Sequence, residues 1–354
     1  MSSLMFALTL FLAGTAVVLA DPPSTPWLHF PPKEGLANGK KIVLVSGDEE
    51  YRSEESCPML GKILSQRHGF DCTVLFAINP ETGLVDPNFR KNIPGLEALA
   101  KADLMIIGTR FRELPDDQYR FVGDFLNAGK PVIGFRTATH AFTGAGQCGR
   151  MKWAEFGLEI LGEKWVAHHG KHRFEGTRGV VEEKNANHPV LRGVTGVFGP
   201  TDVYTVKNLD EAQATVLLRG GITQTLDPAS EILRDDSRNQ PMVPLAWVRE
   251  YTTPDGAKKG RAFCTTMGAA VDFANEGLRR LVVNAAFYLT GLEVPGKADV
   301  QVVDPFNPTF YGFNKNYYDQ RALKPAMWAL GASASTGLAS DTPRPTATAL
   351  PAKP

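Results

Sequence analysis

Short runs of apolar residues alternate with amphipathic segments in the first half of the chain. Runs with few polar positions are typical of strands buried on both faces of a parallel sheet. Four such runs lie at 42–45, 72–76, 103–108 and 131–135. Helices are predicted between them at 53–68, with Ser53 as the N-cap, and at 116–127, where apolar residues repeat with a helical period. This alternation predicts an α/β fold with an open, mainly parallel sheet flanked by helices, as in flavodoxin.

The second half of the chain alternates less regularly. Further strands are predicted at 179–182, 214–218, 243–248 and 262–265, and a last helix at 275–290. Together these elements indicate one α/β domain over residues 41–295, preceded by a lead-in segment, 21–40, that is rich in Pro and Gly. Residues 296–330 carry many aromatic side chains and are interpreted as a strap packed on the domain. Residues 331–354 are mostly Ala, Ser, Thr and Pro, a composition that predicts disorder.

The first twenty residues resemble a signal peptide. An apolar run from residue 4 to 19 ends in Val18-Leu19-Ala20, where small residues suit signal peptidase. We therefore expect export, to the periplasm or out of the cell. The alternative is an uncleaved anchor, but the run is short for a membrane-spanning helix. After cleavage, no remaining segment is apolar enough for a stable membrane span.

Charge and cysteine content exclude some functions. Lys plus Arg and Asp plus Glu both number 38, so the formal net charge is zero and a general nucleic-acid binder is not expected. The four cysteines match no zinc or redox spacing, and no cofactor is expected. A homodimer is suggested by the class of protein, and not by any residue pattern.

Polar side chains gather in the loops that follow three predicted strands. In an open parallel sheet these loops meet at the carboxyl edge, where ligands bind. Arginine guanidinium groups there would suit a carboxylate, a phosphate or sugar hydroxyls. The alternative interpretation is a structural network in which the arginines pair with neighbouring glutamates. The residues concerned are Gly47, Glu49, Tyr51, Arg52, Arg110, Arg112, Arg136, Thr137 and His140.

The segment 132–140 has the form of a nucleophile elbow, a buried strand that turns sharply into a helix start. Arg136 stands at the turn, and arginine is a poor nucleophile because it stays protonated. A second candidate site is the group of histidines at 168, 169 and 172. Its spacing matches no zinc pattern and basic residues interrupt it, so we expect a rim loop and no metal there.

Several motifs, in order and spacing, resemble those of the ThuA-like family, whose fold is that of the class I glutamine amidotransferases. The similarity covers about residues 41–292. The segments that carry it are Val45-Ser46-Gly47 with Tyr51, Gly134 to His140, Asn187 to Gly193, Asp202-Val203-Tyr204, Pro244 to Trp247, and Gly260 to Gly268. The resemblance adds Asp202 and Tyr204 to the expected ligand-binding residues.

The chain also departs from the family pattern. The amidotransferases carry a cysteine where this chain has Arg136, and no histidine follows His188, so glutamine hydrolysis is not expected. ThuA-like proteins often have a histidine where this chain has Ala269-Ala270. The resemblance implies a small-molecule ligand that is a sugar or sugar derivative, such as a keto-sugar.

Three hypotheses follow. The first is a carbohydrate-acting enzyme that uses Glu49 or His140 for proton transfer and Arg110 and Arg136 for electrostatic stabilisation. The second is a non-catalytic binding module on the same fold. The third is a partner-binding role for the strap and tail.

Overall fold

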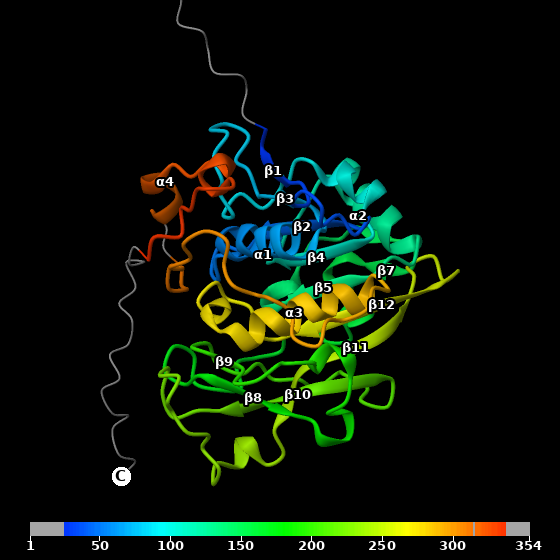
Figure 1. Cartoon of the computed structure of the whole chain (residues 1–354). Coiled ribbons are helices and arrows are strands. Elements are labelled where there is room, and N and C mark those ends of the chain that lie inside the picture. The colour runs from blue at the N-terminus through cyan, green and yellow to red at the C-terminus, as the bar shows by residue number, and fades with distance from the viewer. Residues whose placement is uncertain (1–24, 314–315, 338–354) are drawn as a thin grey trace, which may run out of the picture.

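A ten-stranded mixed sheet runs through the molecule (Figure 1). The computed structural model describes residues 25–313 and 316–337. The strand order is β1-β3-β2-β4-β5-β12-β11-β10-β8-β9. The strands are β1 (Trp27–Phe30), β2 (Lys41–Gly47), β3 (Asp71–Leu75), β4 (Leu104–Thr109), β5 (Val132–Phe135), β8 (Thr177–Val181), β9 (Phe198–Gly199), β10 (Ala214–Ile222), β11 (Val243–Thr252) and β12 (Lys259–Thr265). A separate two-stranded ribbon pairs β6 (Gln147–Cys148) with β7 (Met151–Lys152).

The centre of the sheet is parallel. Strands β3, β2, β4, β5 and β12 are paired in parallel, and their order is the 2-1-3-4-5 order of flavodoxin-like proteins. Strands β11, β10, β8 and β9 extend this sheet in antiparallel fashion, and β1 closes the other edge against β3. The predicted fold class is confirmed. The less regular second half of the sequence corresponds to the antiparallel extension.

Helices cover both faces of the sheet. The long helices are α1 (Ser53–His68), α2 (Asp116–Asn127) and α3 (Glu276–Leu289), and a short α4 (Tyr317–Arg321) follows. Helices α1 and α3 lie side by side on one face (Figure 1), and α2 packs with short helical turns on the other. Buried apolar side chains fill both layers, which explains why β2, β4 and β5 show no alternation of polar and apolar positions. None of the described helices is long and apolar enough to cross a bilayer.

Helices α1 and α2 have the bounds that the sequence predicts, but the predicted N-cap of α1 was wrong. The N-cap of α1 is Arg52, in the left-handed region, and not Ser53. The Ser53 hydroxyl instead accepts hydrogen bonds from the backbone N–H of Gly47 and Asp48, at 3.0 and 3.1 Å, and so closes the loop after β2. The lead-in segment, 21–40, contains the edge strand β1, which the Pro- and Gly-rich composition concealed. The predicted signal peptide lies outside the described residues.

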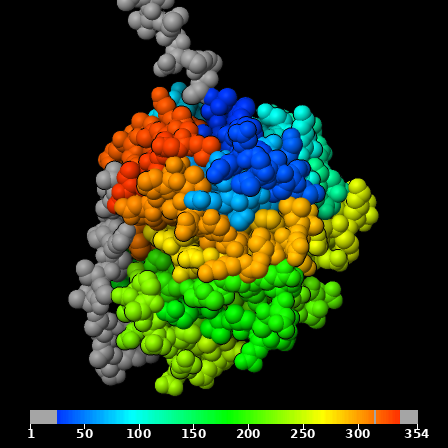
Figure 2. All heavy atoms as spheres, viewed as in Figure 1, coloured from blue at the N-terminus to red at the C-terminus, as the bar shows by residue number. Residues whose placement is uncertain are grey.

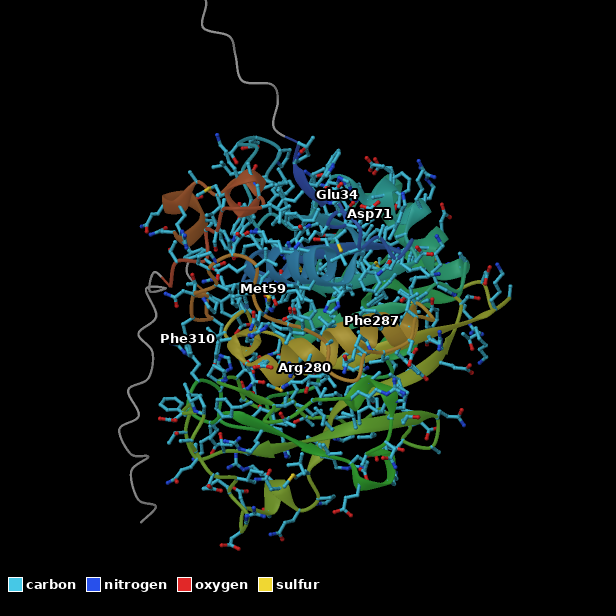
Figure 3. All side chains as sticks on the ribbon, in the orientation of Figure 1. Glu34, Met59, Asp71, Arg280, Phe287 and Phe310 are labelled. Atoms are coloured by element: carbon cyan, nitrogen blue, oxygen red, sulfur yellow. The ribbon has the colours of Figure 1, made fainter. Side chains whose placement is uncertain are left out.

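The strap, residues 296–330, packs across α1 and α3, and Figure 2 shows it as the orange surface beside them. Arg280 lies on α3 (Figure 3), and its Nε donates to the carbonyl of Ala298 at 3.0 Å. Tyr311, Leu323 and Trp328 of the strap are buried. Order continues past the strap, because Ala334 and Ser335 are buried too, so the predicted disorder does not begin at 331. The remainder of the predicted tail, 338–354, lies outside the described residues.

A buried polar cluster joins the strap to the start of α1. Arg52 donates to the Gly312 carbonyl at 2.9 Å and to the Tyr318 hydroxyl at 3.1 Å. The carboxylate of Glu55 accepts from Thr309 N–H at 2.8 Å and from a tyrosine hydroxyl of α4 at 3.1 Å. Glu54 has only the Tyr318 hydroxyl as a partner for Oε1, at 3.0 Å, and its Oε2 has no hydrogen bond. Of the two carboxyl groups in this cluster, Glu54 therefore has the fewer hydrogen-bond donors to stabilise a charged form.

Stability should accordingly depend on the protonation of Glu54. Burial raises its pKa from 4.5 to about 8, so the unfolded chain loses this proton at lower pH than the folded protein does. We expect the free energy of unfolding to fall as pH rises from about 5 to about 8, and Glu54→Gln to remove this part of the dependence. Thermal midpoints across this range, with the exposed Glu97→Gln as control, measure the effect. Parallel curves for wild type and Glu54→Gln would contradict it.

Candidate functional site

The switch point of the sheet lies between the neighbouring strands β2 and β4. Helix α1 follows β2 on one face, whereas α2 follows β4 on the other, so the loops after these two strands turn away from each other. Such a divergence opens a crevice at the carboxyl ends of the strands, where open α/β sheets bind ligands. A cavity of about 370 Å³ lies there, within the range of small-molecule sites. We call it the strand-end pocket; it is lined by Glu50, Tyr51, Arg110, Phe111, His140, Trp165, His168, His172, Arg173, Tyr204, Gly312 and Phe313.

Four of the residues predicted from the sequence line this pocket: Tyr51, Arg110, His140 and Tyr204. The guanidinium of Arg110 lies between two aromatic rings, with its Cζ 4.8 Å from the ring centres of both Phe111 and Phe313. The Phe313 ring comes from the strap and is 58% exposed. The strap therefore supplies part of the wall of the pocket.

Glu49, a predicted catalytic residue, belongs to a structural ion network. Its carboxylate accepts from Arg110 at 2.6 Å and from Arg112 at 3.0 Å. Arg112 is fully buried and also donates to the carbonyl of Pro87 at 2.6 Å. For Glu49 and Arg112 the structure therefore matches the alternative interpretation, in which the charged groups satisfy one another.

Arg136 stands at a strained turn behind the pocket. Its φ of 46° lies in the left-handed region, as the predicted elbow requires, but its side chain is only 1% exposed. The guanidinium donates to the carbonyls of Asp202 and Thr266 at 2.8 and 2.9 Å, and to the Asp202 carboxylate at 3.2 Å. It also lies between the rings of Tyr51 and Tyr204, with its Cζ 4.6 and 3.8 Å from their centres. Arg136 therefore positions pocket residues and does not itself line the pocket.

The other predicted ligand-binding residues lie outside the pocket lining. Arg52 is buried against the strap, and the Thr137 hydroxyl donates to the carboxylate of Asp48 at 2.6 Å. Gly47 lies under the side chain of Arg112, whose Cδ would be 3.1 Å from an added Cβ. Asp202 is fully buried and reaches the pocket only through its histidine partners.

The histidines expected on a rim loop form part of the pocket wall. His168 Nδ1 lies 2.7 Å from one oxygen of the Asp202 carboxylate, and His172 Nδ1 lies 2.9 Å from the other. The backbone of 167–170 pairs with that of 203–205 through hydrogen bonds of 2.8 to 3.1 Å, which holds the start of the histidine loop beside Asp202. Trp165, 37% exposed, extends the same wall.

Burial and charge set the protonation of several groups in the site. Burial and the neighbouring Arg110 hold the pKa of His140 well below its ordinary value, so its imidazole is neutral. Burial, assisted by the charge of Asp48, raises the pKa of Glu50 to about 7. The Arg136 guanidinium and the two histidine contacts hold the pKa of Asp202 well below its usual range despite its burial. Asp202 is therefore a carboxylate at all ordinary pH values.

Sequence reasoning missed Glu50, Trp165, His168, His172 and Phe313 as pocket residues. The spacing of Trp165, His168 and His172 was a usable signal, since it puts three ring side chains in one short loop. Nothing in the sequence connected that loop, or Phe313, to the ends of β2 and β4.

The order of the parallel strands, the strained turn after β5 and the pocket at the strand ends define an α/β protein that is consistent with the class I glutamine amidotransferase-like fold, with arginine in place of the cysteine. The chain belongs to the ThuA family, described as trehalose utilisation, whose model matches residues 41–289. It is similar to a ThuA-like protein of Parabacteroides merdae, with 17% identity over 77% of this chain and 95% of that chain, at a TM-score of 0.48. A ThuA-like protein of Bacteroides uniformis is similar at 14% identity over 73% and 95% of the two chains, with a TM-score of 0.45. No curated protein matched the chain.

Proposed function

We propose that this protein binds a sugar or a sugar-derived ligand, such as a keto-sugar, in the strand-end pocket. The observation that carries the proposal is the make-up of the pocket wall, which combines exposed aromatic rings with hydrogen-bonding groups. Trp165 and Phe313 offer apolar faces against which the C–H face of a sugar ring can pack. Glu50, Arg110 and His168 offer donors and acceptors for hydroxyl groups. The family description, trehalose utilisation, supports the same ligand class.

The proposal excludes glutamine amidotransferase activity. The side chain at the elbow is an arginine that is buried and hydrogen-bonded, so no nucleophile faces the pocket from that position. If the ligand is converted, Glu50 is the best-placed group for proton transfer, because its carboxyl lines the pocket and lies 3.5 Å from His172 Nε2. The second candidate function is binding without reaction, which the structural role of Arg136 favours.

The proposal also includes export to the periplasm or the medium. Its support is the signal-like pattern of the first twenty residues, with small side chains at 18 and 20.

Replacing Trp165 should weaken sugar binding strongly. Trp165→Ala removes an aromatic face from the pocket, and we expect the dissociation constant to rise by about tenfold or more, equivalent to at least about 1.4 kcal/mol. Calorimetric titration with trehalose, other disaccharides and their keto derivatives measures it. Phe174→Ala is the matched control, because that ring is 55% exposed but does not line the pocket.

Product analysis of the same mixtures separates the two candidate functions. Turnover that is lost in Glu50→Gln while binding persists supports an enzyme, whereas binding without any product supports a binding module. The proposed pocket is not the sugar site if wild type binds no sugar. The same conclusion follows if Trp165→Ala and Phe174→Ala both bind sugar as tightly as wild type does.

A further inference from the structure

Two imidazoles and a carboxylate meet at one wall of the strand-end pocket. Donor atoms of His168, His172 and Asp202 all lie within 4.8 Å of one another. The two histidines come from one loop, and Asp202 follows β9, so the group forms only in the folded chain. Such a trio, two histidines and one carboxylate, is a recurrent way to hold a divalent transition metal ion with positions left open.

The distances suit a common metal ion. Metal–nitrogen and metal–oxygen bonds of about 2.0–2.2 Å put neighbouring donor atoms about 3 to 3.5 Å apart. The two Nδ1 atoms already lie 2.7 and 2.9 Å from the oxygens of Asp202, to which they are hydrogen-bonded. A cation that takes the place of these hydrogen bonds would need only small movements of the side chains.

The surroundings hold the three groups ready for a ligand. The side chain of Asp202 is fully buried, while those of His168 and His172 are 34% and 27% exposed and line the pocket. Backbone pairing of 167–170 with 203–205 holds both loops. An added Cβ on Gly170 would lie 3.1 Å from Cβ of Asp202, so the two loops pack closely beside the trio.

Acidic and basic groups both surround the trio, and the basic residues Arg110 and Arg173 line the same pocket. Arg136 contacts Asp202 from the protein interior, on the oxygen that also meets His172. Its positive charge weakens attraction for a metal ion, but the Glu50 carboxyl, 3.5 Å from His172 Nε2, adds a second acidic group on the pocket side. Lys171, which interrupts the motif in sequence, is exposed to solvent.

We propose that His168, His172 and Asp202 form a binding site for a divalent transition metal ion, with open coordination positions that face the pocket. Imidazole and carboxylate donors suit Zn²⁺, Co²⁺, Fe²⁺ or Ni²⁺ better than the all-oxygen sites preferred by Mg²⁺ and Ca²⁺. This site goes beyond the sugar-binding function and does not depend on it, since the metal can be measured without any sugar.

The test is direct metal binding by the full chain, purified without a polyhistidine tag and stripped with a chelator. Titration with Zn²⁺ by calorimetry, and with Co²⁺ by visible absorption, should reveal one saturable site. His168→Ala and His172→Ala should each weaken it by a hundredfold or more. His169→Ala is the matched control, because that neighbour bonds to the Arg238 carbonyl and is not part of the trio.

Each outcome decides the proposal. Stoichiometric binding that both variants lose and His169→Ala keeps supports it. Failure of wild type to bind either ion at millimolar concentration overturns it, as does binding that survives both substitutions, since the ion would then sit elsewhere, for example on a cysteine. Both variants change partly exposed side chains, and circular dichroism verifies that they remain folded. Sugar binding without metal binding would overturn this inference alone.

Discussion

Arg136→Ala should destabilise the protein by about 3–5 kcal/mol, the range found when one partner of a buried ion pair is removed. The substitution leaves the Asp202 carboxylate buried without its guanidinium partner, and two carbonyls lose their donor. It also removes the cation from between the rings of Tyr51 and Tyr204. Urea denaturation at neutral pH, followed by circular dichroism, measures the change in the free energy of unfolding.

Two further variants show that the loss comes from the guanidinium. Arg120→Ala removes an arginine that is 61% exposed and should change stability by less than about 0.5 kcal/mol. Arg136→Gly relieves the left-handed backbone and should be slightly more stable than Arg136→Ala, yet far below wild type. Near-wild-type stability of Arg136→Ala would contradict the structural role of Arg136.

Removing residues 299–354 should abolish cooperative folding. The truncation takes away the buried rings of Tyr311 and Trp328, and each large core aromatic is worth about 3–5 kcal/mol. It also strips Arg52, Glu54 and Glu55 of their partners in the strap. The free energy of unfolding of a whole domain is only about 5–15 kcal/mol. We therefore expect these combined losses to exceed the stability of the remaining chain. Calorimetric and circular-dichroism melts of the truncated protein test this.

Removal of 341–354 alone is the matched control and should leave the thermal midpoint near that of wild type. A truncated protein lacking 299–354 that still melts cooperatively would mean that the strap is an accessory segment. The hypothesis of a partner-binding strap would then regain support, since its aromatic side chains would be free to serve a partner.

The elbow residue has a structural role, whereas other residues line the pocket. At the position where an amidotransferase carries its nucleophile, this chain carries a cation that binds Asp202, Tyr51 and Tyr204. Those groups in turn form or support the pocket wall. The polar side chains that line the pocket include His168 and His172, which come from one loop, and Glu50, which follows β2. Variants at Arg136 therefore test stability, whereas variants at Glu50 and the two histidines test chemistry.

The sequence by itself determined the fold class and much of its detail. Helices α1 and α2 begin and end where the sequence predicted, α1 from the residues of its first turn and α2 from its apolar period, because these signals are local in the chain. Parallel strands were evident as continuous apolar runs, since both faces of such strands are buried. Edge strand β1 escaped prediction because it is short and lies in a segment rich in Pro and Gly.

Only the tertiary structure decided which polar residues form a site. The sequence predicted that charged side chains gather at the strand ends. Whether each side chain points into the pocket or into the protein depends on partners that are distant in the chain. The side chain of Arg136 points into the protein because Asp202 and the Thr266 carbonyl accept its hydrogen bonds there. Arg112 is buried in the same way because it pairs with Glu49. His168 and His172 became pocket residues through pairing of their loop with 203–205. Burial of a charge is tolerated only with a partner in place, and such long-range partners leave no local pattern in the sequence.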